Sequence, residues 1–140
     1  MMFVFLGMVL LVTSLQAQRP VQNAVVSSVS ITKFGLAVGA ANKAPTQLNA
    51  AGEFVIGTND EGFSYTFSMT DPNNSPLTIT VGTIPAFPCA TGTYAYSCGA
   101  SAKISGNYEF IPVLTARDLT TNVKRTVIAT PAVSVQFKVN

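Results

Sequence analysis

Apolar and polar residues alternate along much of the chain, which is the pattern of half-buried strands. The clearest stretches are 63–69, 77–81 and 133–139, where aromatic or aliphatic residues are separated mainly by Ser, Thr, Gln or Lys. Successive side chains of a strand point to opposite faces, so each stretch has one apolar and one hydroxyl-rich face. Weaker candidate strands are 24–31, 34–38, 53–57, 93–97, 108–115 and 123–129. No stretch has the period of an amphipathic helix, so the pattern predicts an all-β chain of antiparallel strands.

Short segments rich in Gly, Pro, Asn and Asp separate these strands at a spacing typical of a β-sandwich. They read NKAP, TNDEG, DPNNSP, PAFPCATG, SGN and RDLTTN. About seven to nine short strands in about 120 residues predict a two-sheet β-sandwich with Greek-key links. Pro112 falls inside a candidate strand and predicts an edge or a bulge there. Residues 40–52 are expected to form a long connection.

The first 17 residues have the composition of a secretory signal peptide. Their apolar run, residues 3–12, is uncharged and too short to cross a bilayer, but it suits the hydrophobic region of a signal. Cleavage is expected after Ala17, which leaves residues 18–140 as one secreted β-sandwich domain with no membrane span. Within it, residues 18–52 form an N-terminal strand segment and its connection. Because the start of the chain lacks a basic residue, a retained anchor is the alternative.

Charge is sparse in this chain. Eight basic and six acidic residues give a net charge of +2, and charged residues make up 10% of the sequence. No basic patch is present, so nucleic acid is not an expected partner. A surface of Ser, Thr, Asn and Ala repels its neighbours only weakly. Such a surface suits a protein that packs against copies of itself or carries glycans, and it also fits a small neutral domain.

The two cysteines, Cys89 and Cys98, lie in the segment PCATGTYAYSCG. In a secreted chain, a pair at this short spacing predicts a disulfide that closes a hairpin loop. On the loop-entropy model such a bond would stabilise the fold by about 2–3 kcal/mol. The spacing is not C-x-x-C and no other soft ligand is present, so a metal or redox role is not expected.

The chain has no histidine, which excludes Ser-His-Asp and Cys-His arrangements and most zinc, copper and non-haem iron sites. The six acids are scattered, so no carboxylate pair for glycoside hydrolysis is apparent. Tyr94 and Tyr96 share one strand face. They form either a small aromatic patch that contacts a ligand or ordinary cross-strand packing. We therefore expect no enzyme activity and no cofactor.

The segment FSYTFSMTDPNNSPLTITVGTIPAF, which begins at Phe63, resembles the first half of the cadherin-like, immunoglobulin-type modules of secreted and cell-surface proteins. Those modules run from a strand with alternating aromatic residues, through a T-D-P-x-x-x-P-L-T turn, into a second strand. The later segment SGNYEFIPVLTARD is similar to another of their strands and ends here at Asp118. The resemblance covers about residues 63–140 and implies an immunoglobulin- or cadherin-like sandwich. The cysteine-bearing insert and the region before Glu53 depart from the family pattern.

In many modules of this family, acidic residues of the turn and of the later strand help to bind calcium between domains. Only Asp71 and Asp118 match those positions, which makes them weak calcium candidates, because a calcium site collects about six to eight oxygens. The alternative is that Asp71 accepts a backbone N–H and starts a turn. The same stretch holds an N-x-S sequon at Asn73, a possible glycosylation site that the following Pro76 disfavours.

These observations favour a non-enzymatic, extracellular or cell-surface structural or adhesive subunit, whose partners are itself or other surface proteins. A strand within residues 24–40 either pairs in its own chain or completes the sheet of a neighbouring subunit, which would build a surface filament by strand donation. The alternative function is a secreted recognition domain that binds a carbohydrate or protein ligand through the Cys89–Cys98 loop.

Overall fold

The computed structural model describes residues 25–58, 62–87, 89–117, 124–125 and 133–140. The regular secondary structure in this part of the chain consists of β-strands alone. They are β1 (Val25–Leu36), β2 (Thr46–Thr58), β3 (Gly62–Thr70), β4 (Thr80–Val81), β5 (Gly92–Ala102), β6 (Gly106–Arg117), β7 (Lys124–Arg125) and β8 (Val135–Val139). Within these residues there is no helix of the length and apolarity needed to span a membrane. The predicted signal peptide and Asp118 lie outside the described residues.

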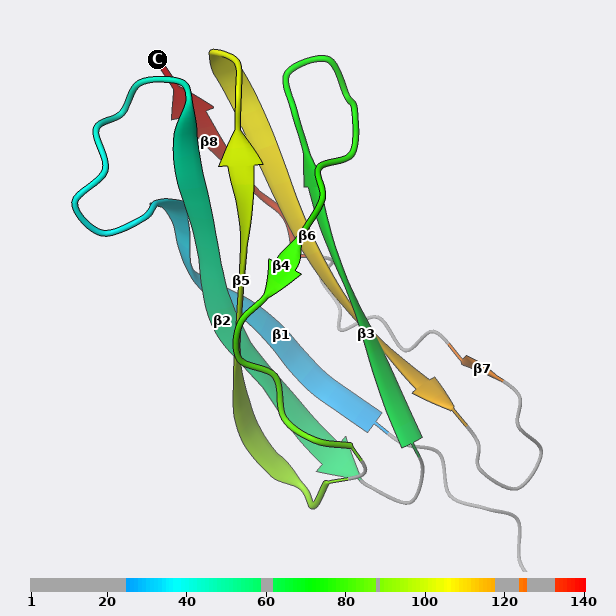
Figure 1. The fold of residues 1–140 in the computed structure, drawn as a ribbon. Coiled ribbons are helices and arrows are strands. Elements are labelled where there is room, and N and C mark those ends of the chain that lie inside the picture. The colour runs from blue at the N-terminus through cyan, green and yellow to red at the C-terminus, as the bar shows by residue number, and fades with distance from the viewer. Residues whose placement is uncertain (1–24, 59–61, 88, 118–123, 126–132) are drawn as a thin grey trace, which may run out of the picture.

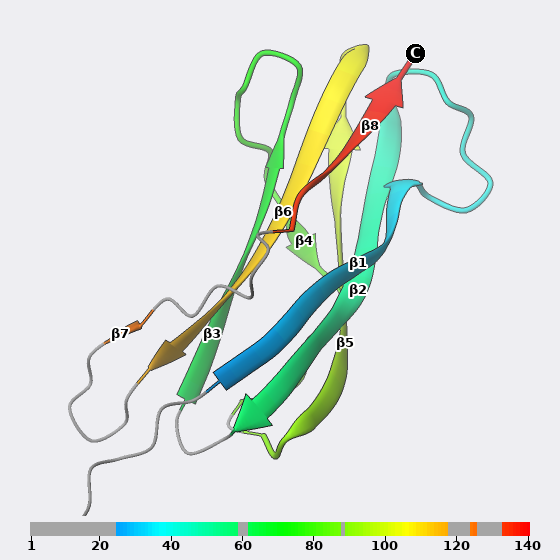
Figure 2. The ribbon, with the colours of Figure 1, turned by 180° about the vertical axis from the view of Figure 1, so that it is seen from behind.

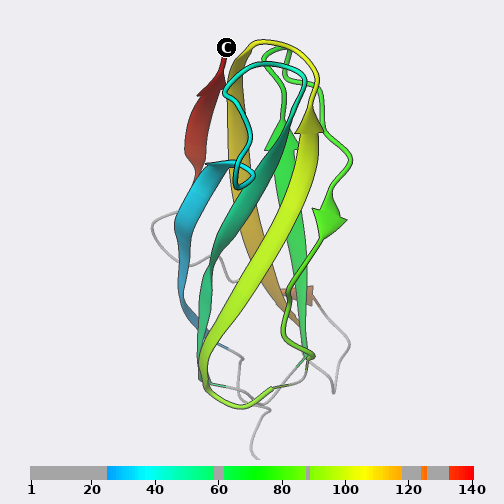
Figure 3. The same ribbon diagram turned by 60° about the vertical axis from the view of Figure 1, so that its left-hand side comes forward.

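The strands form two antiparallel sheets that pack face to face (Figures 1 and 3). One sheet has the order β1-β2-β5-β4; in the other, β6 pairs with β3 along one side and with β8 and β7 along the other. In chain order, β1 to β6 and then β8 take the places of strands A to G of a constant-type immunoglobulin domain, whose sheets are ABED and CFG. The predicted all-β, two-sheet, immunoglobulin-like sandwich is confirmed.

Three expectations about individual strands are wrong. The strand expected over 77–81 is reduced to the two residues of β4, and Val81 is exposed. The candidate strands 24–31 and 34–38 are joined in the single strand β1. The connection expected over 40–52 ends at residue 45, because β2 begins at Thr46. Glycine and, to a lesser degree, alanine are depleted in strands, but β2 lies between β1 and β5. Small residues fit this position, where Leu48 and Ala50 are fully buried.

Aromatic rings fill the space between the sheets. Tyr96 of β5 stacks on Phe54 of β2 at 4.6 Å and on Phe67 of β3 at 5.1 Å between ring centroids. Phe110 of β6 lies 6.1 Å from Phe67. These four side chains are buried, and burying an aromatic side chain of this size dominates core energetics. The cluster therefore joins both sheets at the middle of the sandwich.

Tyr96 also links three neighbouring strands of one sheet. Its side chain crosses β2 over Gly52, and its hydroxyl donates a 2.7 Å hydrogen bond to the Ser30 carbonyl of β1. A Cβ atom at Gly52 would collide with both that carbonyl oxygen and the Tyr96 hydroxyl. β1 is thus paired within its own chain, which is the in-chain alternative of the two predicted for the N-terminal strand.

Tyr108 closes the corner between β5 and β6. It is fully buried, and its hydroxyl donates to the Ile104 carbonyl at 2.6 Å and accepts from the Ile104 N–H at 3.2 Å. Immunoglobulin-like sandwiches contain such a tyrosine near the start of strand F, bonded to the backbone a few residues upstream. This tyrosine corner supports the strand assignment independently of the sheet order.

Pro112 lies inside β6, opposite Phe67 of β3, with its side chain buried. β8 pairs with β6 only from Gly106 to Phe110. Among the described residues, therefore, no strand pairs with Pro112 on the β8 side. A proline has no N–H to give to a ladder, so it fits at this position. Pro112 was predicted to mark an edge strand or a bulge. It lies instead in the central strand β6, at a place where pairing on one side is interrupted.

Candidate functional site

The turn after β3 is organised by Asp71. Its carboxylate oxygen Oδ1 accepts the N–H of Asn73 at 2.8 Å and that of Ser75 at 2.9 Å. Its backbone bonds to Ser75 and Asn74, each at 2.9 Å, and Asn74 takes the left-handed conformation with φ of 61°. The alternative reading of Asp71, as the residue that starts a turn, is confirmed.

The described residues of the turn do not form a metal site. No group of three or more His, Cys, Asp or Glu side chains occurs within this part of the chain. The second calcium candidate, Asp118, lies outside it. Asn73 is exposed at the turn, so its side chain is accessible to a glycosyltransferase, and its glycosylation stays a prediction.

Both cysteines are free thiols, so the predicted Cys89–Cys98 disulfide is not formed. Cys98 belongs to β5 and is 5% exposed in the core. Cys89 interacts with the hydroxyl of Tyr94, whose ring lies against Gly92 at the start of β5. Cys89 therefore precedes β5 and interacts with a side chain from its start, whereas Cys98 lies four residues further along the strand than Tyr94.

Tyr94 and Tyr96 share one face of β5, as predicted, but that face is turned into the core. Tyr96 is 1% exposed, and burial raises the pKa of its hydroxyl, with a smaller contribution from Cys98. Tyr94 is half-buried and donates a 2.6 Å hydrogen bond to the Ala90 carbonyl. Partial burial and then the hydrogen bond with Cys89 raise the pKa of Tyr94. The packing alternative applies, and Tyr96 is not available to a ligand.

Cys98 is expected to react slowly with thiol reagents in the folded protein. Burial raises the pKa of its thiol to about 11, so at pH 8 about one molecule in a thousand carries the reactive thiolate. Labelling with a chromogenic disulfide, without reductant, should reach Cys98 only after unfolding in denaturant, where both cysteines react. Absence of reactive thiols in denaturant would instead show that the two cysteines are bonded.

The raised pKa of the Cys98 thiol makes the stability of the fold sensitive to alkaline pH. The folded-state pKa of Cys98 lies above its ordinary value of 9.0, so the folded state holds the proton more tightly. This contribution to stability is complete below about pH 9 and is lost as pH rises toward about 11. The urea midpoint should therefore fall over this range, and Cys98→Ala should reduce the slope.

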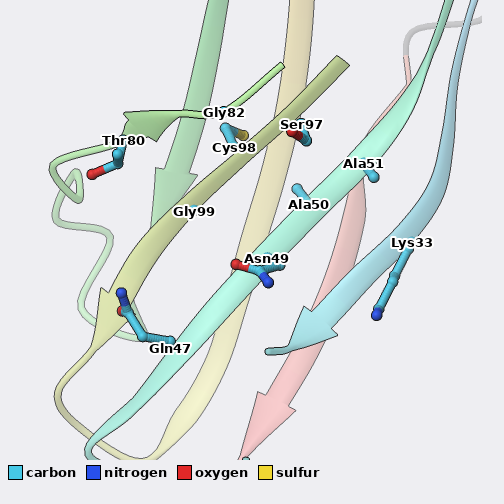
Figure 4. A pocket seen from close by; sticks show the side chains of 10 residues that line it. All are labelled: Lys33, Gln47, Asn49, Ala50, Ala51, Thr80, Gly82, Ser97, Cys98 and Gly99. Carbon is cyan, nitrogen blue, oxygen red and sulfur yellow. The ribbon is translucent and has the colours of Figure 1, made fainter. Parts of the chain in front are cut away.

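The outer face of the β1-β2-β5-β4 sheet has a shallow hollow of about 430 Å³. Small residues of β2 and β5 line it, together with the polar side chains of Lys33, Gln47, Asn49 and Thr80. Lys33 and Thr80 stand on opposite sides of the hollow (Figure 4). The volume would suit a small ligand, but the polar groups do not converge on one point and no aromatic side chain lines the hollow. Sequence reasoning missed it because its positions come from four strands.

The outward-facing positions of β3 and β5 carry no charge. They are Ser64, Thr66, Ser68 and Thr70 on β3, and Thr93, Ala95, Ser97, Gly99 and Ser101 on β5. The intervening residues Phe67 and Met69 of β3 are buried. The alternation predicted for residues 63–69 is confirmed, and it leaves β3 and β5 with neutral outer surfaces of small side chains.

No protein-family model matches the chain, and no curated protein matches it by sequence. Among solved structures, the chain is similar to the crystal structure of the Lin-41 filamin domain, at 14% sequence identity and a TM-score of 0.42. The match covers 81% of this chain and 95% of that chain. The immunoglobulin-like topology therefore rests on the strand order and the tyrosine corner of the chain itself.

Proposed function

We propose that this chain is a non-enzymatic, extracellular structural or adhesive subunit that associates with copies of itself. The observation that carries the proposal is the neutral outer surface of β3 and β5, where every outward-facing residue is Ser, Thr, Ala or Gly. Like charges on facing copies would repel them, and these surfaces present none. The signal-like composition of residues 1–17 supports the extracellular location.

Association of intact domains is favoured over donation of the N-terminal strand. β1 pairs with β2 along its length, and the hydroxyl of Tyr96 bonds to its Ser30 carbonyl. Donation would break this pairing before any new contact formed. The alternative function was a recognition domain that binds its ligand through a disulfide-closed loop and the tyrosines of β5. No disulfide closes that loop, and Tyr96 is buried, so neither feature supports this alternative.

Light scattering coupled to size exclusion, over a wide concentration range, tests the proposal. The average mass should rise above that of one chain as the concentration increases. Because the associating surfaces are uncharged, the association should change little when ionic strength is raised, whereas charge-driven contacts would be screened. A mass equal to one chain at every concentration would overturn the proposal and favour a monomeric ligand-binding domain.

A further inference from the structure

The loop that joins β1 to β2, residues 37–45, projects from the sandwich (Figures 1 and 2). Its first residues, AVGAA, are small and uncharged. Val38 is 91% exposed, and a Cβ atom built at Gly39 would have no neighbour within 4 Å. The peptide bond between Val38 and Gly39 is therefore open to solvent.

A single turn holds the tip of this loop. The Ala40 N–H donates to the Ala37 carbonyl at 3.1 Å, and Gly39 has a φ of 80°. Val38 and Gly39 thus occupy the two central positions of the turn, with glycine where a type II turn needs a positive φ. Opening the turn breaks this one hydrogen bond and leaves the pairing of β1 with β2 in place. Proteolysis acts on such locally opened states.

The two other loops that the structure describes completely are better protected. In the turn after β3, Asp71 accepts two backbone N–H groups, at 2.8 and 2.9 Å. At the corner between β5 and β6, the N–H and the C=O of Ile104 both bond to the hydroxyl of Tyr108. Proteolytic nicking concentrates at exposed loop tips with small residues. Among these three loops, the β1–β2 loop fits this description best.

We propose that the β1–β2 loop is a processing site for an endopeptidase with a small, apolar S1 pocket, which cuts the bond between Val38 and Gly39. Water adds across this bond, so Val38 gains a carboxylate and Gly39 an amino group. The cut changes β1 from a tethered strand into a bound peptide that the same strand of another copy can replace. This inference goes beyond the proposed self-association and does not depend on it, because cutting needs only one chain.

The residues of the loop select the class of protease. The S1 pocket of a serine protease sets which side chain precedes the cut, and a small pocket accepts a small apolar residue such as Val38. A trypsin-type enzyme would need Lys43, whose following residue is anchored. The Ala44 N–H donates to the Asn140 carbonyl at 2.8 Å, and the Asn140 N–H donates to the side-chain oxygen of Asn42 at 3.3 Å. Both bonds hold this end of the loop against the sandwich.

Non-covalent contacts keep β1 in place after the cut. β1 pairs with β2 along its length, and Val26 and Val29 are buried. The ring of Phe34 lies 5.5 Å from that of Phe110, and the Tyr96 hydroxyl bonds to the Ser30 carbonyl at 2.7 Å. None of these contacts involves the loop. The two pieces should therefore stay together as one folded domain.

The uncut loop prevents exchange of β1 because it is a short tether. A strand held by a short flexible linker has an effective concentration of about the millimolar range at its own site. A strand from another copy, present at micromolar concentration, competes poorly against it. Once the bond after Val38 is cut, the two strands compete on equal terms.

Limited proteolysis of the purified, folded chain tests the site. Treatment with an elastase should give one piece ending at Val38 and one beginning at Gly39, identified by mass. The pieces should elute together in size exclusion and separate only in denaturant. Trypsin at the same ratio should leave the bond after Lys43 intact. A first elastase cut at another bond, or trypsin cutting after Lys43 as fast as elastase cuts after Val38, would overturn the proposal.

A matched pair of variants tests the residue before the cut. Val38→Asp places a carboxylate where the apolar pocket must receive it, so cutting at this bond should be at least about tenfold slower. Val81→Asp makes the same change at another exposed valine and should be cut like wild type. Circular dichroism checks that both variants fold. Equal rates in the two variants would contradict the assigned bond.

Strand exchange tests the consequence of the cut. A fluorescent peptide of residues 24–38 is incubated with cut and uncut protein, in urea below the unfolding midpoint to speed release of β1. The cut protein should take up at least about tenfold more peptide than the uncut protein. Equal uptake, or none by the cut protein, would overturn the role of the loop as a tether. A chain that stays monomeric but is cut and exchanged in this way overturns the self-association alone.

Discussion

Replacing Gly52 by alanine should destabilise the fold by about 3 kcal/mol or more. The new Cβ would meet the backbone carbonyl of Ser30, the hydroxyl of Tyr96 and, at 2.6 Å, its Cζ atom. Tyr96 cannot move aside freely, because its ring stacks on Phe54 at 4.6 Å. Overpacking of a core costs about 1–3 kcal/mol, and a carbonyl that loses its partner costs about 1–3 kcal/mol. The free energy of unfolding in urea measures the total of these two costs.

Gly99→Ala is the matched control for this substitution. It makes the same chemical change on the neighbouring strand, where the nearest atoms to a new Cβ are the Asn49 side-chain oxygen and the Leu48 carbonyl, both at 3.1 Å. Its cost should be smaller by about 2 kcal/mol, since ordinary surface substitutions cost little. Tyr96→Phe should lose part of its effect in a Gly52→Ala background, because both substitutions disrupt one contact. A Gly52→Ala chain as stable as wild type would contradict the close crossing of Tyr96.

Removing the hydroxyl of Tyr108 should lower the free energy of unfolding by about 1–3 kcal/mol. That oxygen donates to the Ile104 carbonyl and accepts from the Ile104 N–H. Tyr108→Phe keeps the ring and removes both bonds, which leaves two backbone groups at the β5–β6 corner without their partner. Ile104 is exposed, so water can reach its backbone, and each lost hydrogen bond should cost about 0.5–1.5 kcal/mol. The free energy of unfolding in urea gives the loss.

Tyr65→Phe makes the same deletion at a tyrosine whose hydroxyl has no hydrogen bond to any described residue. Tyr65 is half-buried in β3, so this variant should remain within about 0.5 kcal/mol of wild type. If both variants lost the same stability, the cost would come from the hydroxyl itself and the corner hydrogen bonds would contribute little.

Alternation in sequence predicts a strand where one face is buried and the other is exposed to water. β3 has this arrangement, with Phe67 and Met69 inside and Thr66 and Ser68 outside, and the sequence pattern predicts it correctly. The first part of β2, residues 46–52, was missed because its inner positions include Ala50 and Gly52, which carry little hydrophobic signal. Their small size serves the crossing of Tyr96, and that contact comes from a strand about forty residues later.

The candidate site was predicted less well, for a related reason. The spacing of Tyr94 and Tyr96 correctly shows that they share a face, but the other sheet decides that this face is the core. The spacing of Cys89 and Cys98 likewise does not reveal that Tyr94 folds back against Gly92. The place of β3 at the side of its sheet depends on which strands pair. Sheet order is a property of the whole fold, so a local pattern does not contain it.

The crossing of Tyr96 over Gly52 also has an evolutionary consequence. A tyrosine at position 96 requires a glycine at 52, and a side chain at 52 would also need the Ser30 backbone carbonyl to move, even if the tyrosine were replaced. The glycine should therefore be retained in diverged descendants of this chain wherever the tyrosine is. Together with the tyrosine at position 108, this pair forms a three-residue signature. It should persist after the rest of the sequence has changed beyond ordinary recognition.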